Sequence, residues 1–198
     1  MSYELFNEKI FKFDNDEISV DLQYIETLAP SDALALVDGI DYTGFKLWPG
    51  SEYLCHIIVR HKELFIGKTL LELGSGVGLA GLVASNFARA PVLLTDGEDY
   101  IVDVLQKNVA RNHLEAKVCA ATLYWGRDEA KYLAEYPNKF EVIMGGDLIY
   151  SRQVIQPLLQ CVDALLAPGG VFFMIYVDRA GTGLGPDFLT AAAEAPYS

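Results

Sequence analysis

The sequence has few of the residues that carry metal or redox chemistry. Its 198 residues include three cysteines and three histidines. The cysteines lie at wide spacing in apolar surroundings: Cys55, Cys119 and Cys161. An odd number at such spacing indicates reduced core thiols rather than disulfides. The histidines show neither the HxxxH nor the CxxC pairing that is typical of zinc ligands, so we expect no metal site.

Long apolar runs are also missing. No stretch approaches the roughly 18 apolar residues that a membrane-spanning helix needs, and no apolar N-terminal segment follows a basic one. We therefore expect no contact with a membrane and a location in the cytoplasm, and also in the nucleus.

Basic residues are scarce as well. Lysine and arginine number 15 against 27 aspartates and glutamates, a net charge of −12. Residues 1–45 alone contain ten acids and two lysines, a net of −8. An acidic surface repels phosphate backbones, so we expect no nucleic-acid partner. The acidic segment is either a solvated face or a surface that attracts a basic partner.

Apolar residues are abundant, at 52% of the chain. This length and composition predict one domain over 1–198, with an acidic extension (1–45), a cofactor-binding core (46–180) and a short tail (181–198). The expected strands are 68–73, 91–95, 117–121, 140–145 and 171–177, and the expected helices are 50–62, 78–88, 98–112 and 151–166. Continuous apolar strands alternating with helices indicate a doubly wound α/β fold with a parallel sheet.

Two further local patterns supplement this fold. Segments 9–13 and 18–25 alternate around a short polar turn, which predicts an N-terminal strand pair. Pro168, Gly169 and Gly170 predict the end of a helix before the last strand.

The stretch ELGSGVGL (72–79) is a glycine-rich turn after a strand, and two cofactors compete for it. Residues 76–81 match the GxGxxG pattern of nicotinamide dinucleotides, and an acid follows about twenty residues later. That match begins too late, because the first glycine of a dinucleotide fold closes the strand directly. Read from Gly74, the third position of the pattern is Leu79, and the pattern fails.

S-adenosylmethionine explains the turn better. Gly74, Gly76 and Gly78 would let the backbone approach this cofactor, and Glu72 would supply a carboxylate that suits its positive charges. Asp96 ends the next strand, where its carboxylate can accept both ribose hydroxyls. The alternative for Asp96 is a simple helix cap.

Five ordered motifs resemble one family. They are TGFKLWPG (43–50), LLELGSGVGLAGL (70–82), LLTDGEDYIVDVLQKNVARN (93–112), LYWG (123–126) and GGDLIY (145–150). Together they are similar to methyltransferase family 16, the seven-strand protein-lysine methyltransferases that include calmodulin-lysine and elongation-factor-2-lysine enzymes. The resemblance covers roughly 43–180 and implies a Rossmann-like fold of the class I S-adenosylmethionine-dependent type.

The resemblance also implies roles for individual residues. The cofactor would be contacted by Trp48 along its length, by Gly74, Ser75 and Gly76 at its amino-acid and ribose portions, by Asp96 at the ribose, by Trp125 at the adenine, and by the Gly146 backbone. Asp147 and Tyr150 match the family's (D/E)xx(Y/F) signature and would border the methyl group and the incoming amine. These two are the predicted catalytic residues.

The sequence departs from the family near its end. After strand 171–177 only a helix-like tail follows, so that apolar strand would be an uncovered sheet edge. We expect either a truncated or alternative product, or an edge covered by another segment or subunit. We therefore expect cofactor binding with weak or absent methyl transfer, together with self-association through 171–177.

The sequence as a whole predicts an S-adenosylmethionine-dependent methyltransferase that acts on a lysine side chain of another protein. Three alternatives remain: a small-molecule methyltransferase, an NAD-binding oxidoreductase, and a cofactor-binding module without turnover.

Overall fold

The computed structural model describes residues 6–15, 17–26, 42–178 and 181–194. Its strands are β1 (Asn7–Phe13), β2 (Ile18–Tyr24), β3 (Leu70–Glu72), β4 (Val92–Asp96), β5 (Val118–Thr122), β6 (Phe140–Gly146) and β7 (Leu166–Ile175). Its α-helices are α1 (Pro49–Arg60), α2 (Leu79–Ala84), α3 (Asp99–Arg111), α4 (Glu129–Glu135), α5 (Ile155–Leu165) and α6 (Leu184–Glu194). Short 3-10 helices occupy Tyr42–Phe45, Lys62–Leu64 and Arg152–Val154. Within these ranges no helix is long and apolar enough to cross a bilayer.

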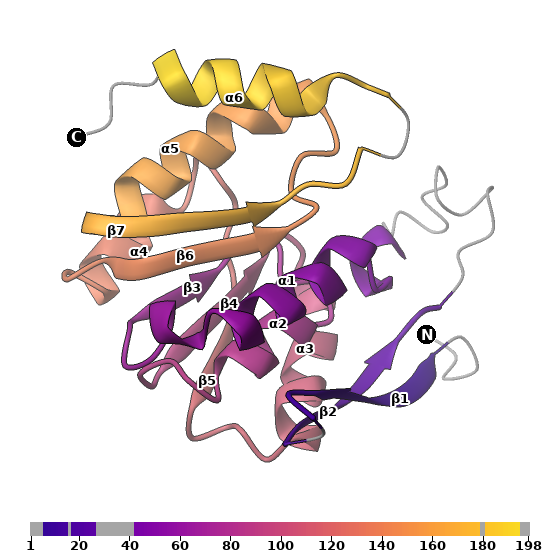
Figure 1. Cartoon of the computed structure of the whole chain (residues 1–198). Coiled ribbons are helices and arrows are strands. Elements are labelled where there is room, and N and C mark those ends of the chain that lie inside the picture. Colours follow the sequence, from indigo (N-terminus) through magenta and orange to yellow (C-terminus); the bar gives the residue numbers. More distant parts are fainter. Residues whose placement is uncertain (1–5, 16, 27–41, 179–180, 195–198) are drawn as a thin grey trace.

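Five of the strands form one parallel sheet in the order β5-β4-β3-β6-β7 (Figure 1). The chain builds outward from β3 to β5 and then returns to the other side of β3 with β6. The direction of winding therefore reverses between β3 and β6. In open parallel sheets the crevice at such a reversal, at the carboxyl ends of the strands, is the usual ligand site.

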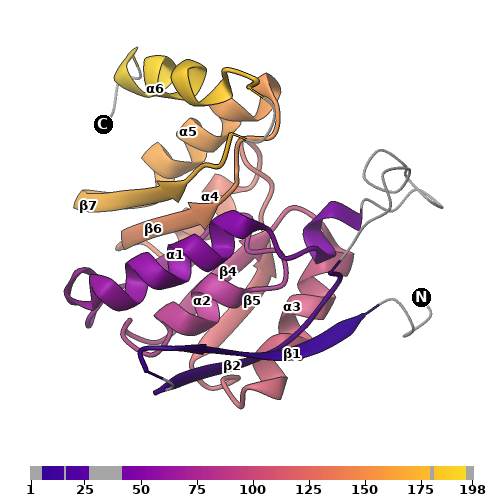
Figure 2. The ribbon, with the colours of Figure 1, turned by 45° about the vertical axis from the view of Figure 1, so that its right-hand side comes forward.

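Helices cover both faces of this sheet. One buried cluster joins α1, α2, α3 and the hairpin of β1 and β2 to one face of the sheet. A second cluster joins α4, α5 and α6 to the other face. Figures 1 and 2 show α5 with α6 on one side of β6 and β7, and α1 with α2 on the other. Burial on both faces explains why the strands read as continuous apolar runs.

The N-terminal strands form a separate antiparallel pair, with Asn7 opposite Tyr24 and Phe13 opposite Ile18. Alternate residues of β2 are buried, and Leu22 is among them. The pair lies beside α3 in both ribbon views. The predicted strand pair is therefore confirmed, whereas residues 27–41 of the acidic extension lie outside the described residues.

The predicted α/β class, its parallel sheet and the helix-like tail are confirmed. Helix α4 was not expected, and the strand predicted at 171–177 begins at Leu166. Pro168 to Gly170 lie within this strand, at a break in register where Phe140 pairs with Leu166 but Val142 pairs with Val171. The helix before them ends at Leu165.

One other expectation needs correction. Cys55 and Cys161 are buried free thiols, but Cys119 is exposed. Cys119 lies on β5, an outer strand of the sheet, so the wide apolar spacing that suggested a core position was misleading. The main sheet of the described residues contains the five expected strands, and the seven strands typical of the family stay a prediction for this chain.

Candidate functional site

A cavity of about 910 Å³ lies at the carboxyl ends of the strands. This volume is within the range that small-molecule sites usually occupy, about 300–1,000 Å³. Its walls come from the segment before α1, the glycine turn, and the loops that follow β4, β5, β6 and β7. The residues predicted for the site that line it are Trp48, Gly74, Ser75, Gly76, Asp96, Trp125, Gly146, Asp147 and Tyr150.

The glycine turn presents bare backbone to this cavity. Gly74 and Gly76 have φ values of 57° and 52°, which residues with a side chain rarely adopt. A Cβ atom on Gly74 would lie 2.8 Å from Leu148 Cδ2, and one on Gly76 would lie 2.9 Å from the Gly44 carbonyl oxygen. Both positions therefore require glycine for conformation and for space.

Reciprocal hydrogen bonds join the turn to β4. The Ser75 amide donates to the Thr95 carbonyl at 2.8 Å, and the Thr95 amide donates to Ser75 Oγ at 3.1 Å. Thr95 Oγ1 in turn donates to the Glu72 carbonyl at 2.8 Å. These bonds hold the turn beside Asp96, the next residue of β4.

Asp96 is held by the turn itself, because the Gly76 amide donates to its Oδ2 at 2.9 Å. Burial raises the pKa of Asp96 to about 6, although the amides of Gly76, Glu98 and Gly97 act in the opposite direction. At neutral pH the carboxylate is mostly ionised. It is therefore a strong acceptor for ligand hydroxyls at the edge of the cavity.

Glu72 lies on the other side of the turn and does not line the cavity. Side chains alternate along β3, so Glu72 points to the same face as Leu70, toward α2. Its Oε2 accepts a 3.0 Å bond from the Gly81 amide, and it is 3% exposed. The structure therefore gives Glu72 a contact within the fold, and its predicted contact with a cofactor stays a prediction.

Gly78 also lies outside the cavity lining. It has φ 93° and precedes the first residue of α2, and a Cβ there would be 2.3 Å from Leu105 Cδ1. The sequence predicted Gly78 as a contact of the cofactor, and that contact stays a prediction. The structure shows another need for glycine at this position. The reason is its backbone conformation and its contact with α3.

Two tryptophans form aromatic walls. Trp48 Nε1 donates to the Thr43 carbonyl at 3.0 Å, and Lys46 Nζ lies 4.6 Å from the Trp48 ring centroid. Trp125 approaches the glycine turn, since a Cβ on Gly74 would lie 3.6 Å from its Cζ2. Flat rings beside bare backbone can receive a planar ligand group.

Glu98 and Tyr124 also line the cavity but were not predicted. The Tyr124 hydroxyl donates to Glu98 Oε1 at 2.8 Å, and this bond raises the pKa of Tyr124. Glu98 follows Asp96 by two residues, and Tyr124 is part of the quoted LYWG motif. Their proximity to two recognised positions is the signal that could have found them.

Asp147 connects three parts of the chain. Its Oδ2 accepts from the Gly50 amide at 2.9 Å, its Oδ1 accepts from the Val177 amide at 3.1 Å, and its own amide donates to Ile175 at 2.7 Å. Its φ of 57° is unusual for a residue with a side chain. Tyr150, three residues later, is 73% exposed at the mouth of the cavity.

These features of the cavity fit S-adenosylmethionine. Bare backbone at Gly74 and Gly76, an ionised Asp96 on the neighbouring strand and two aromatic rings surround one cavity. A carboxylate accepts the hydroxyls of a ribose, and acidic surroundings suit a ligand that carries an ammonium and a sulfonium group. The fold and site thus define a class of proteins that bind a ribose-containing cofactor at a parallel sheet.

Comparisons with known proteins narrow this class. The model of a family described as lysine methyltransferase matches residues 32–193. Calmodulin-lysine N-methyltransferase of Arabidopsis thaliana is 33% identical over 132 residues, covering 64% of this chain and 42% of that protein. EEF1A lysine methyltransferase 3 of Xenopus tropicalis is 30% identical over 131 residues, covering 65% and 55%.

A solved structure shows the same fold. The PRMT1 enzyme–prozyme complex of Trypanosoma brucei with AdoHcy has a TM-score of 0.51 and 20% identity, covering 62% of this chain and 38% of that one.

The chain belongs to the lysine methyltransferase family. This membership confirms the resemblance seen in the motifs, the class I fold, and S-adenosylmethionine as the cofactor. The chain spans about half the length of the two curated relatives described above.

We predict that Asp96 makes cofactor affinity depend on pH. Because its pKa is about 6, protonation at lower pH removes the charged acceptor, and the dissociation constant should rise about tenfold at pH 5. Asp96→Ala should weaken binding about ten- to hundredfold, the usual scale for a charge-assisted bond. Asp96→Asn, which keeps an acceptor but cannot titrate, should lose the pH dependence. Calorimetry that shows parental affinity in a folded Asp96→Ala protein would end this assignment.

We also predict that Glu72 destabilises the protein as pH rises. Burial raises its pKa from 4.5 to about 8, against the opposing bonds from Ser75 and Gly81. Between these values the folded state binds more protons than the unfolded state, so the free energy of unfolding should fall with increasing pH. Glu72→Gln should flatten this dependence in denaturant titrations, whereas exposed Glu52→Gln should not. Identical pH profiles for both variants would contradict the assignment.

Proposed function

We propose that this protein is an S-adenosylmethionine-dependent methyltransferase that modifies a lysine side chain of another protein. The observation that carries the proposal is the position of Asp147 and Tyr150 in the same cavity as the glycine turn and Asp96. The site that would hold the cofactor thus borders the residues expected to receive the amine. The names of the similar proteins, which act on calmodulin or EEF1A lysines, support a protein substrate.

The cofactor supplies an activated methyl group, so the protein has mainly to position and deprotonate the amine. A lysine with a pKa near 10.4 is neutral only to about one part in a few thousand at pH 7. Tyr150 at the mouth would help to exclude water and favour the neutral amine. Its exposure leaves room for a side chain to enter from a separate molecule.

Asp147 fits the role of an orienting residue better than that of a base. Both of its carboxylate oxygens already accept backbone amides, from Gly50 and Val177. These bonds fix the plane of the carboxylate. An amine that approaches would meet a carboxylate of fixed direction, which favours orientation of its lone pair.

The sharpest test is methylation of a lysate. We expect incubation with labelled cofactor to label a protein band whose modified lysine mass spectrometry identifies. Asp147→Asn should reduce this labelling strongly while its cofactor dissociation constant stays within a few fold. Exposed Asp103→Asn on α3 is the matched control and should label like the parent. Cofactor binding without label in any protein would favour a binding module instead, and equal rates for Asp147→Asn would remove its catalytic role.

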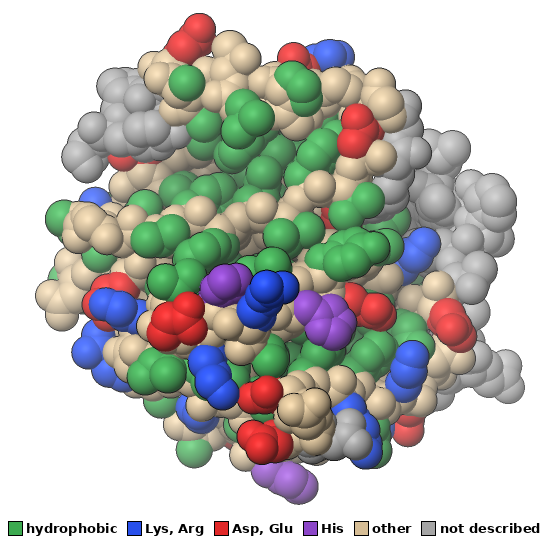
Figure 3. Space-filling view, viewed as in Figure 1, with side chains coloured by type: hydrophobic (Ala, Val, Ile, Leu, Met, Phe, Trp, Pro, Cys, Tyr) green, Lys and Arg blue, Asp and Glu red, His purple; other side chains and the backbone are tan. Residues whose placement is uncertain are grey.

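Strand β7 supports a second part of the proposal, which is self-association of two copies through this edge. Among the described residues β7 pairs only with β6. Figure 3 shows hydrophobic side chains gathered on the face where Figure 1 draws β7. No charged residue occurs in 166–177 despite the net charge of −12, so two such edges would not repel each other locally. An unpaired apolar edge is a template for another strand.

We also propose that the protein is located in the cytoplasm.

We predict that the protein forms dimers at micromolar concentration and that a charge on the edge prevents them. Val171 is 45% exposed on β7, and Leu189 is 70% exposed on α6. Val171→Lys should therefore give monomers by light scattering, whereas Leu189→Lys, the same change away from the edge, should leave dimers. A parent protein that stays monomeric across the concentration series would refute the self-association.

A further inference from the structure

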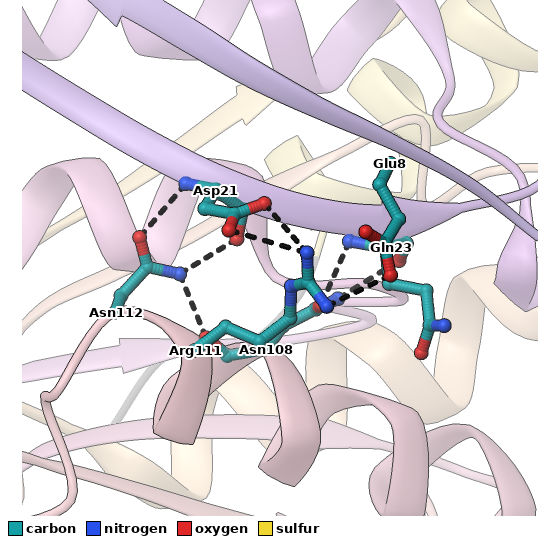
Figure 4. A network of polar contacts seen from close by, with 6 residues as sticks. All are labelled: Glu8, Asp21, Gln23, Asn108, Arg111 and Asn112. Carbon is teal, nitrogen blue, oxygen red and sulfur yellow. Dashed lines mark hydrogen bonds and ion pairs between the residues drawn. The ribbon is translucent and has the colours of Figure 1, made fainter.

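Asn108 of α3 and Asn112, which caps the C-terminus of this helix, bind the outer edge of the N-terminal strand pair. Asn108 and Asn112 are four residues apart and so lie on one face of the helix. Figure 4 shows both side chains reaching β2, at Gln23 and Asp21 respectively. These two strand residues are also two apart, so their amides and carbonyls share the edge of β2 that faces α3.

Each asparagine pairs with its strand residue as a neighbouring strand would. The Asp21 amide donates to Asn112 Oδ1 at 2.8 Å, and Asn112 Nδ2 donates back to the Asp21 carbonyl at 2.8 Å. The Gln23 amide donates to Asn108 Oδ1 at 2.8 Å, and Asn108 Nδ2 donates to the Gln23 carbonyl at 3.0 Å. The helix thus closes an open strand edge with two carboxamides.

The two asparagines differ in their third hydrogen bond. Asn112 Nδ2 donates to the Asn108 carbonyl at 2.7 Å, within its own helix. Asn108 Nδ2 instead donates to the Val77 carbonyl at 2.9 Å. Val77 lies in the glycine turn and lines the cavity. One carboxamide therefore joins the hairpin, α3 and the cofactor-binding turn.

Asn108 is well placed to control the turn. It is 0% exposed, and its carboxamide oxygen and both amide hydrogens can be used by the three bonds. Val77 lies between Gly76, whose amide donates to Asp96, and Gly78, which packs against Leu105 of the same helix. Loss of the carboxamide would leave the Val77 carbonyl without this donor and release the turn where it contacts Asp96.

Arg111 adds an outer clamp to the same network. Its guanidinium bonds Glu8 Oε1 at 2.9 Å and Asp21 Oδ1 at 3.0 Å. Exposed ion pairs of this kind contribute little to stability. The apolar face of β2 also docks the hairpin. Among the polar contacts, only the fully buried Asn108 extends this docking to the cavity.

We propose that Asn108 is a positioning residue for cofactor binding, through which the docked hairpin sets the conformation of the glycine turn. This inference rests on the cofactor site of the proposed function. It also gives the N-terminal strand pair, which contributes no residue to the cavity lining among the described residues, a role in the activity.

The test compares Asn108→Ala with Asn112→Ala. Both variants should loosen the hairpin and lower the unfolding temperature. Asn108→Ala should also raise the cofactor dissociation constant at least about tenfold, whereas Asn112→Ala should stay within about threefold, because only Asn108 bonds the turn. Without cofactor, hydrogen exchange of the Gly76 and Gly78 amides should quicken in Asn108→Ala alone.

Equal losses of affinity in the two variants, or parental affinity in Asn108→Ala, would overturn the inference. If Asn108→Ala does not fold, Asn108→Asp and Asn112→Asp keep the shape and an acceptor oxygen, remove the amide donors and add the same carboxyl at both positions, with the same expected difference. If the parent binds no cofactor, the proposed function fails, whereas the exchange measurement on the turn still decides the role of Asn108.

Discussion

The pairing of Ser75 with Thr95 is the constraint on which the site depends. Each residue donates its amide to the other, one to a carbonyl and one to a hydroxyl. This pairing continues the hydrogen bonding between β3 and β4 past the last residue of β3, so the turn must leave the sheet beside Asp96. Gly74 and Gly76 have positive φ values on either side of Ser75. The hydrogen bonds to β4 thus determine the conformation of the turn, and the turn forms one wall of the cavity.

The positions of residues at strand ends could be predicted, because each follows directly from the apolar run of its own strand. In a parallel sheet every strand ends at the same edge, so an acid after VLLT or a GGD after an apolar run must lie near the site. The direction of the Glu72 side chain was harder to predict, although the alternation of side chains along β3 would have placed it with Leu70 on the side of α2. The motif drew attention to its charge, whereas the structure uses that carboxyl to bind Gly81.

Other features depended on tertiary contacts that no local pattern reveals. Helix α4 has one buried residue, Tyr132, so it carries too weak an apolar periodicity to be recognised. The break in β7 lets Pro168 lie within a strand, because a parallel register can be resumed at Val171. The sequence placed Asn108 in a helix, but its partner Gln23 lies 85 residues away.

Asp147 and Asn108 show a common principle in this fold. Both use side chains to bind backbone groups of distant segments, one at the entrance to α1 and the end of β7, the other at β2 and the glycine turn. Such bonds position main chain, whose groups have fixed directions, more exactly than contacts between flexible side chains. Gly74 and Gly76 present bare backbone to the cavity, and backbone in that position needs this kind of support. The cavity can therefore owe its shape to polar residues outside the glycine motif, and their substitution should alter the site without changing any residue of the motif.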